Sequence, residues 1–163
     1  MSQPTVRQIM RLEVPTAAPE ASIAELAKTM VADNVPGIPI VENGELVGIV
    51  TEADLIQREA EVEAPKLATF FDAIIVGDAG VPFEEELRRV TATTARELMS
   101  SPVISIRDDA TLSEFATLIM QYAVNPVPVV DAQRRIVGLA TRRGLIETIA
   151  RLESVGEMES SQG

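Results

Sequence analysis

One short segment combines residue types that could hold a hydroxylated, anionic ligand: Gly48-Ile49-Val50-Thr51-Glu52-Ala53-Asp54. The apolar run before Thr51 predicts a strand over Leu46–Val50, and a helix is expected to begin directly after Thr51. Thr51 and Asp54 would then lie on the first helical turn, where unpaired backbone N–H groups and the helix dipole favour negative charge. Such a helix start is a suitable place for an anionic ligand that carries hydroxyl groups.

The same residues have a simpler interpretation as a helix cap. A threonine hydroxyl accepts from the third helical amide, and an acid at that position suits the dipole. A second copy of the segment, residues 136–144, keeps Gly138 and Thr141 but has Gly144 where the first has Asp54. Capping by itself needs no carboxylate, so both interpretations stay open and are compatible.

The elements around this segment occur twice, which predicts a tandem duplication. Each repeat begins with a short segment, here called the lead-in, at residues 6–10 and 95–99. Met10 and Met99 end the two lead-ins and lie 89 positions apart, and Ile38–Val41 matches Val127–Val130 in the same register. One residue inserted near Arg135 shifts the register to 90 for Gly48 and Gly138. A repeat found this often in one register is a strong sign of internal duplication.

Each repeat predicts the order β-α-β-β-α. Short extended pieces are expected at Glu13–Thr16 and Val103–Ile106, and helices are expected to begin at the capping boxes of Ser22 and Thr111. Asn43-Gly44 predicts a tight hairpin turn, whereas the second repeat has the longer turn 131–135.

We expect two repeats, residues 1–58 and 93–153, to form one module, with a helical insertion at 59–92 and a frayed acidic tail at 154–163. The insertion holds Phe70 and Phe71 and is interpreted either as a helical hairpin packed on its own domain or as a contact with a partner.

Composition narrows the possible functions. The chain has 163 residues, 46% hydrophobic, with a net charge of −11, so nucleic-acid binding is disfavoured. It has no Cys and no His, which removes thiolate chemistry, the usual zinc sites and His-activated nucleophiles. We therefore expect no catalytic residues, no metal site and no obligatory cofactor. No membrane span or signal-peptide pattern is seen, which predicts a cytoplasmic protein.

The ordered set of the Met-ending lead-in, the strand-starting Pro39 and Pro128, and Gly48-x-x-Thr51-x-x-Asp54 resembles a pair of CBS domains, often called a Bateman module. The resemblance implies an α/β (α+β) fold in which two β-α-β-β-α repeats pack sheet to sheet around a pseudo-two-fold axis. It also implies a homodimer and a regulatory module that binds AMP, ADP, ATP or S-adenosylmethionine between the repeats.

By this resemblance Asp54 would hold the ribose hydroxyls, and the rest of a first cleft would be Gly37, Ile38, Pro39, Thr51, Ala53, Val103, Ile104 and Ser105. A weaker second cleft would use Thr16, Val127, Pro128, Thr141, Arg142 and Arg143. The absent carboxylate at Gly144 puts ribose binding there in doubt. Arg142 and Arg143 are interpreted either as a phosphate site or as ordinary solvated arginines.

Three functions remain to be weighed. The first is a non-catalytic sensor of an adenine nucleotide or adenosyl ligand that signals by a conformational shift. The second is a structural dimerisation or adaptor module whose clefts are vestigial. The third, an enzyme using Asp or Glu pairs, is disfavoured because no such pair is tied to a predicted cleft.

Overall fold

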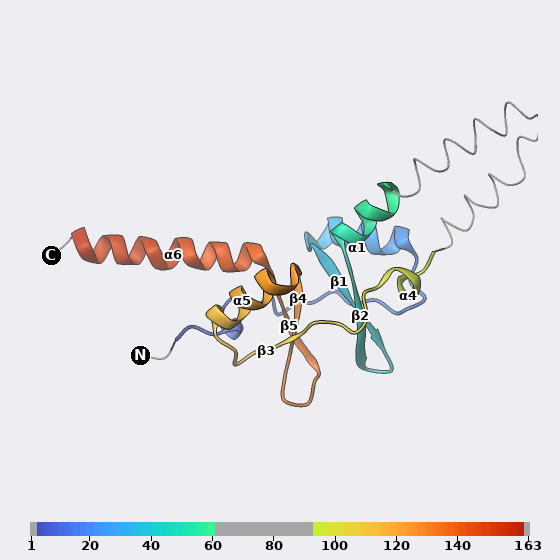
Figure 1. Cartoon of the computed structure of the whole chain (residues 1–163), viewed down its shortest axis with the longest axis horizontal. Coiled ribbons are helices and arrows are strands. Elements are labelled where there is room, and N and C mark those ends of the chain that lie inside the picture. The colour runs from blue at the N-terminus through green and yellow to red at the C-terminus, as the bar shows by residue number, and fades with distance from the viewer. Residues whose placement is uncertain (1–2, 61–92, 162–163) are drawn as a thin grey trace, which may run out of the picture. The chain divides into compact units, whose positions relative to one another are not determined.

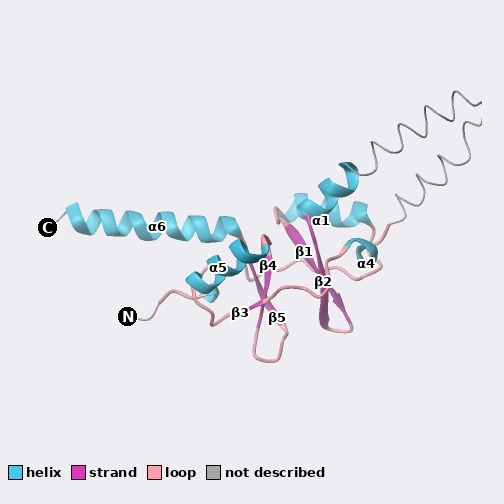
Figure 2. Ribbon diagram, in the orientation of Figure 1, coloured by secondary structure: helices cyan, strands magenta, loops and turns pink. Residues whose placement is uncertain are grey.

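The computed structural model describes residues 3–60 and 93–161. Within these ranges the fold is mixed α+β with small sheets, and Figure 2 shows its helices and strands. The predicted insertion, with Phe70 and Phe71, lies almost entirely outside the described residues. None of the helices described is long and apolar enough to span a membrane.

The elements follow the predicted order in each repeat, except that the first extended piece of the first repeat forms no strand (Figure 1). The first repeat contains η1 (Val6–Gln8), α1 (Ile23–Asp33), β1 (Gly37–Glu42), β2 (Glu45–Thr51) and a helix at residues 52–60. The second contains α4 (Ala95–Leu98), β3 (Ile106–Arg107), α5 (Leu112–Tyr122), β4 (Val127–Val130), β5 (Ile136–Ala140) and α6 (Arg142–Ser161). Because α6 continues to Ser161, the frayed tail expected from Ser154 is replaced by helix.

The parallel pairing joins equivalent residues in the two repeats, but it forms a strand only in the second. In the second, β3 pairs parallel with β4, with Ile106 opposite Val129, and β4 pairs antiparallel with β5. In the first, the parallel pairing is a single bridge between Ala17 and Ile40, the residues equivalent to Ile106 and Val129. Pairing therefore occurs at or just after the ends of the two predicted extended pieces.

Both predicted helix starts are confirmed. The Ser22 hydroxyl accepts from the Glu25 amide at 3.2 Å, and the Thr111 hydroxyl accepts from the Glu114 amide at 3.1 Å. Each glutamate returns a bond to the backbone of its cap residue. These reciprocal bonds satisfy two otherwise unpaired amides at each helix start.

The chain divides into two compact units that do not coincide with the sequence repeats. Unit 1 contains Met1–Val14, Gly44–Leu46 and Val103–Gly163, and unit 2 contains Pro15–Asn43 and Val47–Pro102. The lead-in of the first repeat therefore folds with the second repeat, and the lead-in of the second repeat folds with the first.

Equivalent backbone hydrogen bonds hold each lead-in to the other repeat. In unit 1 the Val6 amide donates to the Ala110 carbonyl at 2.8 Å, and in unit 2 the equivalent Ala95 amide donates to the Ala21 carbonyl at 2.9 Å. Val6 and Ala95 are both fully buried. Each lead-in thus supplies a buried residue to the core built around the other repeat.

Arginines in equivalent positions reinforce the two lead-ins. Arg7 pairs with Asp108 at 2.7 Å in unit 1, while Arg96 pairs with Glu20 and Glu42 in unit 2. These acids hold the pKa of each guanidinium above its ordinary value, chiefly through side-chain hydrogen bonds. The exposed pairs contribute orientation more than stability.

A methionine at the end of each lead-in lies against a glycine. A Cβ atom on Gly138 would lie 2.5 Å from the Met10 sulfur, and one on Gly48 would lie 2.8 Å from the Met99 Cγ atom. Both glycines are buried within strands. Only a residue without a side chain fits at these two positions while the methionine stays in place.

The two hairpin turns differ in construction. Asn43 and Gly44 have φ values of 52° and 80°, so both adopt the left-handed conformation that the Asn-Gly pair predicts. In the longer turn, the Asp131 carboxylate accepts from the Gln133 amide at 2.9 Å and the Arg135 amide at 3.0 Å. The Arg135 amide is the main reason that the pKa of Asp131 lies below its ordinary value.

We predict that Gly48→Ala lowers the free energy of unfolding by about 1–3 kcal/mol, because the new methyl group overpacks against Met99. The loss should shrink in a Met99→Ala background, with a coupling energy of about 0.5–3 kcal/mol in urea unfolding. Gly156→Ala is the control, because a Cβ atom there meets nothing within 4 Å. If Gly48→Ala lowers the free energy of unfolding equally with and without Met99→Ala, the contact between Gly48 and Met99 is not the cause of the loss.

We also predict that the Asp131 carboxylate makes stability depend on pH. Since its folded-state pKa is lowered, its contribution is present above the unfolded value of about 3.8 and is lost as pH falls through the folded value. The stability difference between the protein and its Asp131→Asn variant should therefore narrow below about pH 4 in urea unfolding. The narrowing should persist at high salt, because backbone hydrogen bonds cause most of the shift. A difference that does not change with pH would rule out this role.

Candidate functional site

Thr51 and Asp54 form a reciprocal hydrogen-bonded pair where β2 ends and the helix at 52–60 begins. The Asp54 Oδ2 atom accepts from the Thr51 amide at 2.8 Å and from the Thr51 hydroxyl at 3.1 Å. The Thr51 hydroxyl in turn accepts from the Asp54 amide at 3.3 Å. Helix capping at this point is therefore observed, and it orients the half-buried carboxylate.

Capping leaves part of the carboxylate available. Every hydrogen bond to this group within the described residues uses Oδ2, so Oδ1 has no hydrogen-bond partner among them. An ionised carboxylate has lone pairs on both oxygens and can accept several hydrogen bonds at once. One group can thus cap the helix through Oδ2 and accept ligand hydroxyls through Oδ1.

The start of β1 is fixed beside this helix start. The Glu52 amide, next to Thr51, donates to the Pro36 carbonyl at 2.9 Å. The predicted wall residues Gly37, Ile38 and Pro39 follow on β1 and are all buried, with Ile38 fully so. Their side chains belong to the core, so backbone atoms are what this segment offers to a ligand.

The second repeat builds its helix start differently. The Thr141 hydroxyl accepts from the Gly144 amide at 3.0 Å, as Thr51 does from Asp54, but there is no carboxylate to return the bond. Instead the Asn125 side chain accepts from the Arg142 amide at 3.0 Å. Sequence analysis missed this capping role of Asn125, because the residue lies 17 positions before the helix that it caps.

Gly144 is crowded by the lead-in of unit 1. A Cβ atom on Gly144 would lie 3.2 Å from the Ile9 carbonyl oxygen and 3.2 Å from the Thr141 hydroxyl. An aspartate here would have to displace that backbone slightly and would bring its charge close to a carbonyl oxygen. The structure thus gives a physical reason for the glycine at this position.

Arg142 and Arg143 are exposed at the start of α6. The Arg143 Nε atom donates to Glu147, one turn later, at 3.0 Å. This acidic neighbour offsets the unfavourable interaction between the Arg143 charge and the helix dipole. The arrangement favours the interpretation of Arg143 as a solvated surface residue over that of a phosphate ligand.

The remaining predicted site residues are divided between the two units. Thr51, Ala53 and Asp54 lie in unit 2 with Gly37–Pro39, whereas Val103–Ser105 lie in unit 1. Likewise Thr16 lies in unit 2, while its predicted companions Val127, Pro128 and Thr141–Arg143 lie in unit 1. Each predicted cleft therefore takes residues from both units and stays a prediction.

Among residues 3–60 and 93–161, no group of three acidic side chains is placed to hold a metal ion. The chemistry that the described site offers is hydrogen bonding from amides at a helix start and acceptance by one oriented carboxylate. That combination can bind hydroxyl groups and the polar edges of a ligand.

Some curated relatives are much longer than this chain. It is 27% identical over 138 residues to the MJ1225 protein of Methanocaldococcus jannaschii, covering 85% of this chain and 44% of that protein. It is 30% identical over 148 residues to L-aspartate semialdehyde sulfurtransferase of the same organism, covering 90% of this chain but only 23% of that enzyme. The matched region is a minor part of each relative.

Solved structures similar to this chain match it along nearly its full length. The CBS domain pair of protein MJ0100, solved with 5′-methylthioadenosine and S-adenosyl-L-methionine, is 27% identical with a TM-score of 0.68, covering 95% of this chain and 99% of that one. CBSX2 from Arabidopsis thaliana, solved with AMP, is 20% identical with a TM-score of 0.68, covering 92% of this chain and 98% of that one.

The family model of the CBS domain matches residues 6–61 and 95–151, which are the two repeats found in the sequence. The repeat order, the glycine-threonine segment and the similar solved structures agree with this match. The chain therefore belongs to the CBS domain family and contains a tandem pair of CBS domains.

Proposed function

We propose that this CBS pair is a non-catalytic regulatory module that binds an adenine nucleotide or adenosyl ligand in a cleft between its repeats. The observation that carries the proposal is the Asp54 carboxylate, which is oriented by Thr51 and keeps Oδ1 available. A ribose presents two neighbouring hydroxyls, and a carboxylate can accept from both with charge-assisted hydrogen bonds.

Charge favours an adenosyl ligand with little negative charge. The chain carries a net charge of −11, and the segment 34–37 before β1 has no basic residue. ATP would need cations that this part of the chain does not supply. The MJ0100 domain pair, solved with 5′-methylthioadenosine and S-adenosyl-L-methionine, supports the same ligand class.

Signalling would follow from differential binding. A ligand that contacts both repeats stabilises the arrangement to which it binds more tightly, and a partner would sense the change in population. The exchanged lead-ins support this mechanism, because each links one repeat covalently to the unit built around the other.

We predict that S-adenosylmethionine, 5′-methylthioadenosine or AMP raises the melting temperature, and that Asp54→Asn removes most of the rise. A ligand at about 100 times its Kd stabilises the folded state by about 2.7 kcal/mol, which corresponds to a rise of several degrees. The measurement is thermal unfolding with each ligand and with ADP, ATP and magnesium.

The matched control is Glu114→Gln. Glu114 is also the third residue of a helix with a reciprocal cap, but it has no predicted ligand role. If both variants lower the ligand-induced rise equally, Asp54 acts only as a cap. If no ligand raises the melting temperature, the sensor proposal fails and the adaptor function takes its place.

The alternative function, a dimerisation or adaptor module, is favoured by equivalent exposed side chains on the helices of both units. Val31 and Ile56 are 83% and 70% exposed in unit 2, and their equivalents Met120 and Ile146 are 76% and 62% exposed in unit 1. Exposed apolar side chains at equivalent positions of both repeats suit contact with a second copy of the chain.

We predict that the double variant Ile56→Ser and Ile146→Ser shifts a dimer toward monomer in light scattering coupled to gel filtration. Leu12→Ser is the control, because Leu12 is 76% exposed but does not lie on any of the four helices that carry these exposed side chains. A dimer unaffected by the double variant would show that these positions are not the interface.

A further inference from the structure

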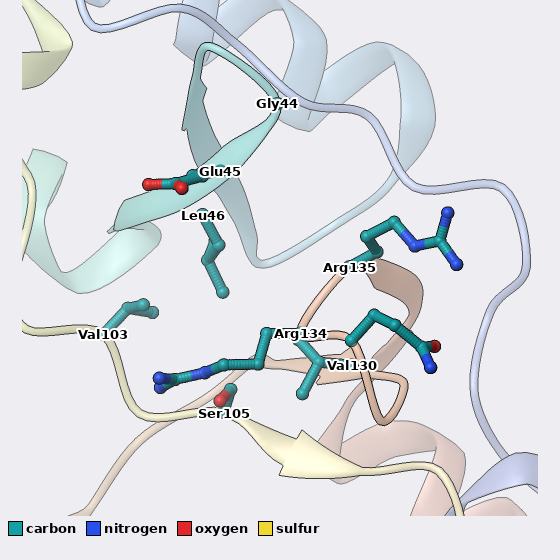
Figure 3. Close-up of a pocket in the computed structure, with 9 residues that line it drawn as sticks. Gly44, Glu45, Leu46, Val103, Ser105, Val130, Arg134 and Arg135 are labelled. Carbon is teal, nitrogen blue, oxygen red and sulfur yellow. The ribbon is translucent and has the colours of Figure 1, made fainter.

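A pocket lies within unit 1, at the hairpin turn end of β4 and β5. Its volume is about 420 Å³, and its lining includes the apolar side chains of Leu46, Val103 and Val130. Ser105 and Arg134 supply polar groups to the same pocket. Figure 3 shows the Arg134 side chain extending beside Ser105, while Arg135 points the other way. The volume lies within the usual range of small-molecule sites, about 300–1,000 Å³.

The longer turn of the second repeat is what presents Arg134. Its amide donates to the Asp131 carbonyl at 3.0 Å, and the Asp131 carboxylate holds the amides on either side of it. Arg134 has a φ of 65°, a conformation that is uncommon for residues other than glycine and costs free energy. The first repeat has the shorter Asn43-Gly44 turn here, so this feature distinguishes the repeats.

Arg134 differs from the neighbouring arginines in its ion pairs. Arg135 pairs with Asp131 at 3.4 Å, and Arg107 pairs with Asp109 at 3.4 Å. The Arg134 guanidinium, by contrast, has no hydrogen bond or ion pair with any described residue. Glu45 also lines the pocket, but Figure 3 places it at the end opposite Arg134, with Leu46 between them.

This pocket shares Val103 and Ser105 with the predicted nucleotide cleft, but Ile104 and Asp54 do not line it. Successive side chains of an extended chain point to opposite faces, so Val103 and Ser105 share one face and Ile104 has the other. Val103 and Ser105 line the pocket with Arg134, whereas Ile104 does not. Asp54, which carries the proposed nucleotide site, belongs to unit 2.

We propose that this pocket binds a small organic carboxylate with a branched apolar body. The carboxylate would accept a bidentate pair of hydrogen bonds from Arg134 and a further one from the Ser105 hydroxyl. The apolar body would lie against Leu46, Val103 and Val130, which a purely inorganic anion cannot use. Because the arginine is exposed, the affinity is expected in the millimolar range.

The test is an NMR titration of the full chain with 3-methylbutanoate, 3-methylbutanamide and inorganic phosphate. The carboxylate should shift the amide signals of Val103, Ser105 and Val130, and the neutral amide of the same shape should not. Arg134→Gln should weaken binding at least about tenfold. Arg151→Gln is the control, because it removes an exposed arginine of the same unit that donates to Thr148.

Each other outcome overturns the proposal. Equal binding by the neutral amide would remove the role of charge, and no effect of Arg134→Gln would remove the role of Arg134. If phosphate shifts the same signals and binds as tightly as the carboxylate, the pocket recognises charge alone and the ligand class is wrong. The Asp54→Asn variant should bind 3-methylbutanoate normally, so this site and the nucleotide site can fail independently.

Discussion

The packing of a methionine against a glycine is the contact on which the rest of the fold depends. Met10 lies against Gly138 in unit 1, and Met99 lies against Gly48 in unit 2. Beside each contact, antiparallel backbone bonds join Arg11 to Leu139 and Ser100 to Ile49. The methionine that ends a lead-in and the glycine within a strand look independent in the sequence. The contacts connect them, because the methionine of one repeat packs where the other repeat has its glycine. Neither repeat therefore completes its own core.

This constraint extends to the segment that we propose binds the ligand. Gly48 and Thr51 lie on the same strand, so the methionine that excludes a side chain at Gly48 also fixes the strand end that presents Thr51 and Asp54. In unit 1 the other lead-in, which ends at Met10, brings the Ile9 carbonyl close to Gly144, where a side chain would be crowded. The two equivalent helix starts therefore differ, because the first has room for a carboxylate that bonds to Thr51 and the second is crowded by a backbone carbonyl.

Local features were predictable from the sequence, and long-range ones were not. The Asn43-Gly44 turn and the caps at Ser22 and Thr111 are confirmed because a few neighbouring residues determine them. The exchange of lead-ins was missed, since equivalent residues look alike whichever repeat they pack on. The Asp54 cap was predicted, but the capping role of Asn125 depends on a tertiary contact that no local pattern shows.

Differences between the copies identify where a duplicated module has specialised. The second repeat departs from the first at the turn before β5, which has an extra residue, and at Gly144 after β5. The first change places an arginine without a described partner beside a pocket, and the second removes a carboxylate from a helix start. Both changes make the second repeat more positive on a chain whose net charge is −11. The pairing of β4 with β5 shifts register between Val129 and Val130, beside the turn that holds the extra residue, whereas Val127, Pro128 and Val129 stay paired with Ala140, Leu139 and Gly138. The extra residue is therefore absorbed at the turn end of the hairpin, and the strand end that leads to Gly144 keeps its pairing.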